Sequence, residues 1–125
     1  MLNFFDSFFK KDNDLEKMNF SLEIGPHTDL ETLPSVKDVY VTMLPGGDYK
    51  DTADKSGDLV KKGFNPVPHF PARSINNEDE LKNYVTRCKD QGIKQALVIG
   101  GSREPIGKFD SSYQILETGF FEGIK

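Results

Sequence analysis

Short apolar runs alternate along this chain with segments whose apolar residues recur at helical spacing. Four of the runs predict strands, near residues 21–25, 38–43, 65–70 and 94–99. Strands that alternate with helices in this regular way are typical of a parallel sheet with right-handed crossovers. We therefore expect an α/β fold of four strand–helix units, with the strands side by side in chain order and the helices on the outer face.

Capping residues mark two of the helices between these strands. Asp51 or Thr52 is the expected N-cap of a helix that stops at Gly63. Asn77, followed three residues later by Glu80, gives the next helix a start that resembles a capping box. Both helices should pack an apolar face against the sheet.

The last helix is expected to start at Asp110 or Ser111 and to end near Gly119. Cys88 lies on the apolar face of the helix before it, so we expect an inert core thiol. The third predicted strand contains a conflict, because Pro66 and Pro68 cannot donate hydrogen bonds to a neighbouring strand.

Residues 1–20 form a separate, amphipathic N-terminal segment ahead of the domain at residues 21–125. Its apolar positions include Leu2, Phe5, Phe8 and Phe9, which have helical spacing. Such a helix either packs its aromatic face on the rest of the domain or docks on a membrane surface or a partner.

Length and charge narrow the classes of function. A chain of 125 residues can form one domain, but a complete (β/α)8 barrel needs about twice that length. The net charge is −4 without a basic stripe, so we expect a small-molecule ligand rather than nucleic acid. A single cysteine agrees with a reducing compartment, and no apolar run approaches a membrane span, so we expect a cytoplasmic protein without a membrane partner.

Polar or glycine-rich turns follow three of the predicted strands. They contain Gly25-Pro26-His27, Pro45-Gly46-Gly47 and Gly100-Gly101-Ser102. Ligands bind at the carboxyl ends of the strands in parallel α/β sheets, because the loops there vary while the sheet holds them in place. The candidate site is therefore expected at that rim.

The strand ends resemble those of methylenetetrahydrofolate reductases in order and spacing. The motifs are Ser-Leu-Glu-Ile at 21–24, Val-Tyr-Val-Thr at 39–42, Pro-His-Phe-Pro-Ala-Arg at 68–73 and Gln-Ala-Leu-Val-Ile-Gly-Gly at 95–101. Pro-Gly-Gly, Pro-His-Phe-Pro-Ala-Arg and a late Leu-Glu-Thr-Gly together are similar to a divergent, reductase-like branch. The resemblance covers residues 20–123.

This resemblance implies a flavoprotein with a (β/α)8 TIM barrel, of which the chain would supply the amino-terminal half. The family reduces 5,10-methylenetetrahydrofolate to 5-methyltetrahydrofolate, and NADH or NADPH usually reduces the FAD. Glu23 matches the glutamate that acts in the family as general acid when the five-membered ring of the folate opens. Without the family, Glu23 could equally be a solvated carboxylate at the end of a strand.

The resemblance also implies cofactor-binding positions. They are Thr42, Met43, His69, Gly100, Gly101, Ser102 and Ser111. Met43 replaces a residue of another type. His69 has a competing interpretation as a core histidine, and Gly100-Gly101 as a tight turn that needs positive φ. Ser111 matches a position beside the flavin's phosphate and ribitol, at a helix N-terminus.

The turn after the fourth strand departs from the family pattern. The family has Arg-Gly-Asp where this chain has Gly100-Gly101-Ser102, so a negative charge is missing beside the expected flavin. We expect this loss to favour the anionic reduced flavin and to raise its reduction potential.

Two other functions remain open. One is a metal site in a barrel lyase or aldolase, formed by Glu23, His27 and His69, although their spacing is not diagnostic. The other is a non-catalytic half-barrel that assembles with a second copy or with another polypeptide, because its edge strands would be unpaired in a monomer.

Overall fold

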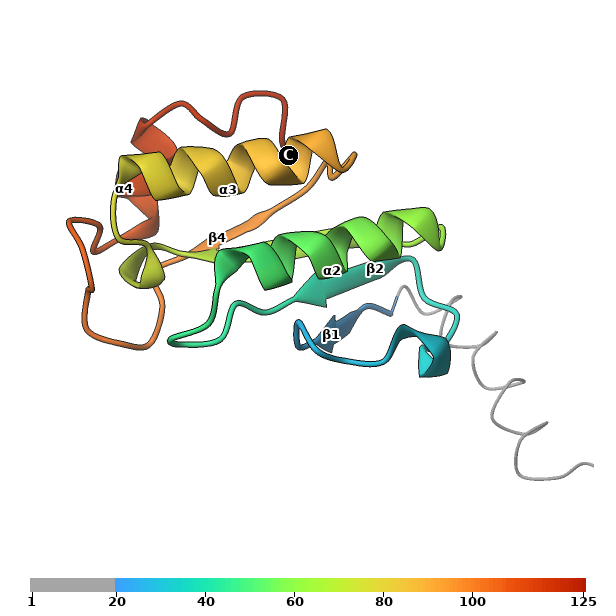
Figure 1. The fold of residues 1–125 in the computed structure, drawn as a ribbon. Helices are drawn as coiled ribbons and strands as arrows, with labels where there is room; N and C mark the ends of the chain where they lie inside the picture. The colour runs from blue at the N-terminus through green and yellow to red at the C-terminus, as the bar shows by residue number, and fades with distance from the viewer. Residues whose placement is uncertain (1–19) are drawn as a thin grey trace, which may run out of the picture.

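The computed structural model describes residues 20–125, and the predicted helix at the amino terminus lies outside these residues. Four strands form one sheet in the order β1-β2-β3-β4 (Figure 1). They are β1 (Leu22–Ile24), β2 (Asp38–Val41), β3 (Asn65–Pro71) and β4 (Leu97–Ile99). All neighbouring strands are parallel, which confirms the predicted α/β class and strand order.

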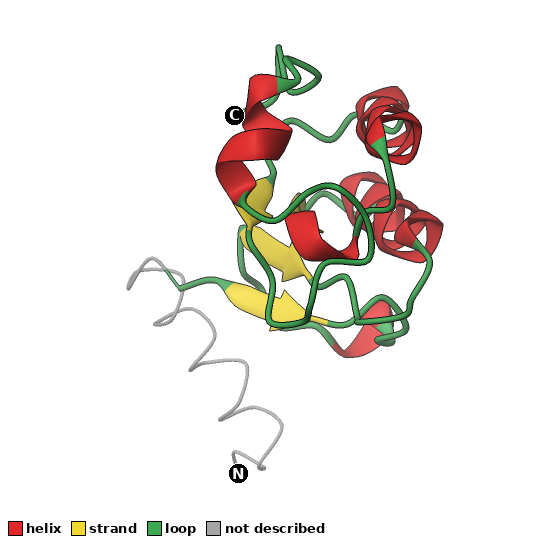
Figure 2. Cartoon of the chain, turned by 90° about the vertical axis from the view of Figure 1, so that its left-hand side faces the viewer, coloured by secondary structure: helices red, strands yellow, loops and turns green. Residues whose placement is uncertain are grey.

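Two long helices cover one face of the sheet, as Figure 2 shows from the end. They are α2 (Tyr49–Lys61) and α3 (Glu78–Asp90), while the short α4 (Ser112–Glu117) lies beside β4. Short 3₁₀ helices, η1 (Leu30–Thr32) and η2 (Ala72–Ser74), follow β1 and β3. No helix of residues 20–125 lies against the opposite face of β1 and β2 (Figure 2).

The predicted N-cap of α2 was wrong by three or four residues. The helix starts after Asp48, whose side chain accepts a hydrogen bond from the amide of Lys50 at 2.9 Å. Asp51 is instead an acidic residue of the first turn. The other two predicted starts are confirmed, because Asn77 accepts from the Glu80 amide at 2.8 Å and Ser111 is the N-cap of α4.

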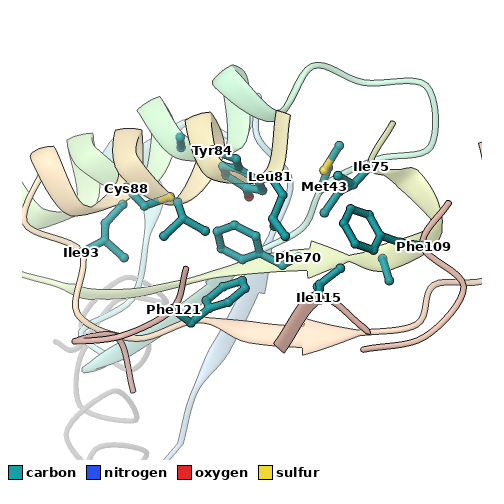
Figure 3. Packing of buried hydrophobic residues seen from close by; sticks show 13 residues of the cluster. Met43, Phe70, Ile75, Leu81, Tyr84, Cys88, Ile93, Phe109, Ile115 and Phe121 are labelled. Atoms are coloured by element: carbon teal, nitrogen blue, oxygen red, sulfur yellow. The ribbon is translucent and has the colours of Figure 1, made fainter. Parts of the chain in front are cut away.

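The main core fills the space between β3 and the helices (Figure 3). Phe70 points from β3 toward α3 and stacks on Tyr84 with ring centroids 3.9 Å apart, and Phe121 meets it edge-on at 4.9 Å. Cys88 is fully buried in this cluster, and burial raises the pKa of its thiol to about 12. This confirms the prediction of an inert core cysteine.

The prolines of β3 fit the sheet because they point to the side of β4, ahead of the residues at which β4 begins to pair. The amide of Asn65 donates to the Lys37 carbonyl on the β2 side, so the alternate positions Pro66 and Pro68 face β4. β4 pairs with β3 only from His69 to Pro71. The two missing N–H groups therefore lie where no β4 strand needs them.

The same arrangement explains why β4 is shorter than the predicted strand at 94–99. Residues ahead of Leu97 do not pair with β3, but they do pair with the last residue of the chain. Lys125 donates to the Lys94 carbonyl at 2.9 Å and accepts from the Ala96 amide at 3.0 Å. This is the bonding pattern of a parallel ladder, with Lys125 beside Gln95.

Candidate functional site

Residues of the uncovered sheet face and of the carboxyl rim make up the candidate site. Val39 and Val41 point toward the helices and are fully buried, so Tyr40, which lies between them in β2, is on the other face. Glu23 pairs with Tyr40 and therefore shares that face. His69 shares that face, because it precedes Phe70, whose ring points to α3.

Glu23 and His69 approach each other across β2. Glu23 Oε1 lies 3.6 Å from His69 Nε2, and the Glu23 side chain is 64% exposed while His69 is 8% exposed. Tyr40 from the intervening strand sets its ring edge-on to the imidazole, with centroids 6.1 Å apart. A surface carboxylate thus meets a buried imidazole.

The Nε2 atom of His69 is buried and has no hydrogen-bond partner among residues 20–125. Burial lowers the pKa of His69 below its usual 6.5, and the nearby Glu23 carboxylate opposes this only in part. At neutral pH the imidazole is therefore uncharged. A buried polar atom without a partner is costly, so this nitrogen is the best candidate for a contact with a ligand.

Tyr84 fixes the main chain of His69 from the helix side of the sheet. Its hydroxyl donates to the His69 carbonyl at 2.9 Å inside the core. Burial raises the pKa of Tyr84 well above 10, so the hydroxyl keeps its proton and remains a donor. The histidine is therefore held by α3 although its imidazole lies on the opposite face.

Thr42 lies at the carboxyl end of β2 and ties that end to β1. Its amide and its hydroxyl both donate to the Ile24 carbonyl, at 2.9 and 3.3 Å. The side chain remains partly exposed. Thr42 therefore belongs to the rim that carries Glu23, as expected from its place at a strand end.

A depression of about 330 Å³ lies at the carboxyl ends of β2, β3 and β4. Its lining residues come from the last residues of β3 and β4 and from the segments that follow β2, β3 and β4: Met43, Pro45, Pro71, Ser74, Ile99, Gly101, Ser102 and Arg103. Three of them, Met43, Gly101 and Ser102, are predicted cofactor-binding residues. The lining is largely apolar, with two hydroxyls and one cation.

Gly101 has a left-handed backbone with φ of +100°. A Cβ atom there would lie 3.4 Å from the Cβ of Pro71 and 3.7 Å from that of Arg73. The predicted need for a glycine with positive φ in this turn is confirmed. Met43 is 8% exposed and belongs to the main core, so it forms the floor of the depression rather than a free contact.

The Glu23–His69 pair and the depression both include a residue of β3. His69 and Pro71 lie two residues apart on the same face of the strand, so roughly 7 Å of strand separates them. Other depressions of about 500 and 530 Å³ lie between the first turns of α2 and α3 and around Pro34 and Phe64. Neither is lined by a predicted site residue.

Gly100 and Ser111 have structural partners instead of a place in the depression. The Gly100 carbonyl accepts from the Arg73 amide at 3.0 Å. The Ser111 amide donates to Gln114 Oε1 at 3.1 Å, within the cap of the six-residue helix α4. Neither residue lines the depression.

Several residues of this region were not predicted from the sequence, among them Tyr40, Arg73, Ser74 and Arg103. Tyr40 could have been found from the sequence, because it lies two positions before Thr42 and residues two apart along a strand share one face. Ser74 ends the short 3₁₀ helix η2 and Arg103 lies in a loop, and no periodicity in the sequence predicts the path of either segment. Arg73 lies within the motif at 68–73, but its partners are more than 25 residues away along the chain.

The proposed metal site is wrong. Among residues 20–125, no group of three His, Cys, Asp or Glu side chains is placed to hold a metal ion. His27 instead lies 3.9 Å from Asp51, and both side chains are at least half exposed. Within this part of the chain, Glu23 and His69 therefore have no third metal ligand beside them.

No protein-family model matches the chain. Within the part of the chain that the structure describes, every helix is too short or too polar to cross a membrane.

Proposed function

We propose that this chain is the amino-terminal half of a flavin-dependent oxidoreductase barrel of one-carbon metabolism, similar to methylenetetrahydrofolate reductase. One observation carries the proposal. Glu23 lies 3.6 Å from His69, whose buried Nε2 atom lacks a partner, at the rim that also holds the depression with Gly101 and Ser102. These are the positions that the resemblance assigns to proton transfer and to flavin binding.

The depression and its surroundings fit a planar ring with polar edges. Pro71, Ile99 and Met43 offer an apolar surface, and the positive φ of Gly101 favours a residue without a side chain in the turn. His69 Nε2 supplies the polar contact that it now lacks. Bound FAD would supply the hydride for folate reduction, with NADH or NADPH as the electron donor.

The charge around the depression supports the expected effect of Ser102. Among the described residues that line it, Arg103 is the one charged side chain and none is acidic. A positive environment stabilises an anionic reduced flavin, so the reduction potential should be higher than in an enzyme with an aspartate at this turn.

Glu23 is placed to deliver a proton in this proposal. It is open to solvent on one side and faces the uncharged imidazole on the other. A folate that covered the carboxyl would shield it from water, and a general acid acts best in such a dry site. N10 of the folate would receive the proton as the five-membered ring opens.

Two features support the part of the proposal that places this chain in a barrel: the sheet face that carries Glu23, and the edge of β4. Glu23, Tyr40 and His69 face no helix of residues 20–125, and in a closed barrel they would face the interior. Lys125 already continues the sheet beside Gln95 with parallel bonding. Strands five to eight, from the same or another polypeptide, would complete the ring in the cytoplasm.

A second candidate is a non-catalytic half-barrel that pairs with another copy of itself. Within residues 20–125, β1 is an edge strand and one face of β1 and β2 carries no helix, and both features favour this candidate. Light scattering on the purified protein separates the two, because this candidate requires a dimer without flavin.

The direct test of the proposal is flavin content. The protein expressed at the full length of its natural reading frame should copurify with FAD or take it up after reconstitution, as measured by absorbance and by chromatography of the released cofactor. A full-length protein that neither contains nor binds FAD contradicts the proposal.

A further inference from the structure

Arg73 connects both ends of the loop that forms one wall of the depression. It lies in η2, directly after β3. Its Nε donates to the carbonyl and to Oδ1 of Asp110, at 2.9 and 3.0 Å. Its Nη1 donates to the Gly101 carbonyl at 3.3 Å. One guanidinium thus spans residues 101 and 110.

The main chain of Arg73 adds two further bonds to the same segment. Its amide donates to Gly100 at 3.0 Å, and its carbonyl accepts from the Ile106 amide at 3.1 Å. The loop is therefore fixed at its start, middle and end by one residue. Lys108 also pairs with Glu78 at 2.6 Å, but both side chains are more than half exposed and such pairs stabilise little.

Arg73 does not itself line the depression. Its neighbours Pro71 and Ser74 form one side, and Gly101, Ser102 and Arg103 of the loop form the other. The positive charge of Arg73 is matched by the Asp110 carboxylate, so it is not free to bind an anion. Its contribution must come through the loop.

We infer that Arg73 is a positioning residue that holds residues 100–110 in the shape of the ligand site. The role of the depression as a flavin site rests on the proposed function. That Arg73 holds the loop rests only on its hydrogen bonds to residues 100–110. Arg73 bonds both walls at once, so its loss separates Gly101 and Ser102 from Pro71 and Ser74. The affinity for the flavin then falls without a loss of any flavin contact by Arg73 itself.

The test compares Arg73→Gln with Arg87→Gln in the full-length protein. Arg87 is a matched control, since its guanidinium pairs with Asp54 at 2.8 and 2.9 Å and is 43% exposed, against 37% for Arg73. That pair joins α2 and α3, away from the depression. Arg73→Lys keeps the charge but cannot reach Gly101 and Asp110 together, so it should have an intermediate effect.

The first measurement is hydrogen exchange of residues 101–109, with tryptic cleavage at Arg103 and Lys108 as a second reading. Both rates should rise by about tenfold or more in Arg73→Gln, because at least two side-chain hydrogen bonds are lost, and should be unchanged in Arg87→Gln. Equal rates in the two variants overturn the inference.

The second measurement is a fluorescence titration with FAD. Arg73→Gln should bind FAD about tenfold more weakly and with an altered visible absorption band, whereas Arg87→Gln should match the unchanged protein at similar thermal stability. If Arg73→Gln opens the loop and yet binds FAD normally, the positioning role is wrong. If the unchanged protein binds no FAD, the proposed function fails, and the exchange rates alone decide whether Arg73 holds the loop.

Discussion

His69 combines a buried, partnerless Nε2 atom with a carboxylate 3.6 Å away, and its protonation therefore reports on the candidate site. Burial lowers its pKa below 6.5 in the folded state, while the Glu23 charge raises it in part. We predict that an NMR titration of the imidazole gives a pKa below 6.5, and a still lower one in Glu23→Gln. Asp51→Asn, which changes a carboxylate beside His27 instead, should leave the His69 titration unaltered.

The same pKa shift has a consequence for stability. Between the folded pKa and 6.5 the unfolded chain binds the proton more readily than the folded one, so stability decreases as the pH falls below 6.5. Urea unfolding of His69→Gln should show a weaker decrease over that range. An unchanged pH dependence would mean that the imidazole is solvated in the folded protein.

At the scale of elements, the start of α2 is the clearest difference between the predicted and the observed structure. Asp48 caps the helix through the Lys50 amide, whereas Asp51 lies within the first turn. Asp48→Ala should therefore lower the free energy of unfolding by about 1 kcal/mol, and Asp51→Ala by only a few tenths. Urea unfolding measures both, and a larger loss in Asp51→Ala would contradict the assigned cap.

The sequence predicted elements well where local signals agree with packing. The Asn77 cap, the apolar face with Cys88 and the order of the parallel strands follow from short-range patterns. The end of the β3–β4 pairing depends on Pro66 and Pro68 and on Lys125, which lies far along the chain. Such long-range pairing has no periodicity in the sequence, so the predicted fourth strand was too long.

The candidate site was predictable from the sequence only where its residues lie at the ends of strands. Strand ends carry Glu23, Thr42 and His69, and alternation along a strand places them on one side. The loop that holds Ser102 and Arg103 against Pro71 depends on Arg73, and only the folded chain reveals those contacts. The resemblance pointed to Ser111, but its amide bonds within the α4 cap.

At the scale of the whole molecule, the uncovered face decides what the chain can do alone. The Glu23 side chain is 64% exposed, and a site that is open on one side cannot exclude solvent from a reaction. We predict that the isolated 125-residue chain binds FAD weakly or not at all, at least about tenfold more weakly than a protein that supplies the remaining strands. A fluorescence titration that finds equal affinities would contradict the need for a closed barrel.

The central claim is that Glu23 protonates the substrate beside a bound flavin, and two half-reactions measured by stopped-flow absorbance test it most directly. In full-length protein, Glu23→Gln should leave FAD binding and reduction by the nicotinamide nearly intact, because glutamine is almost isosteric. Reoxidation by the folate should slow by ~10²-fold or more, since the amide cannot give up a proton. If both half-reactions slow equally, Glu23 positions the flavin or the fold, and its assignment as the general acid is wrong.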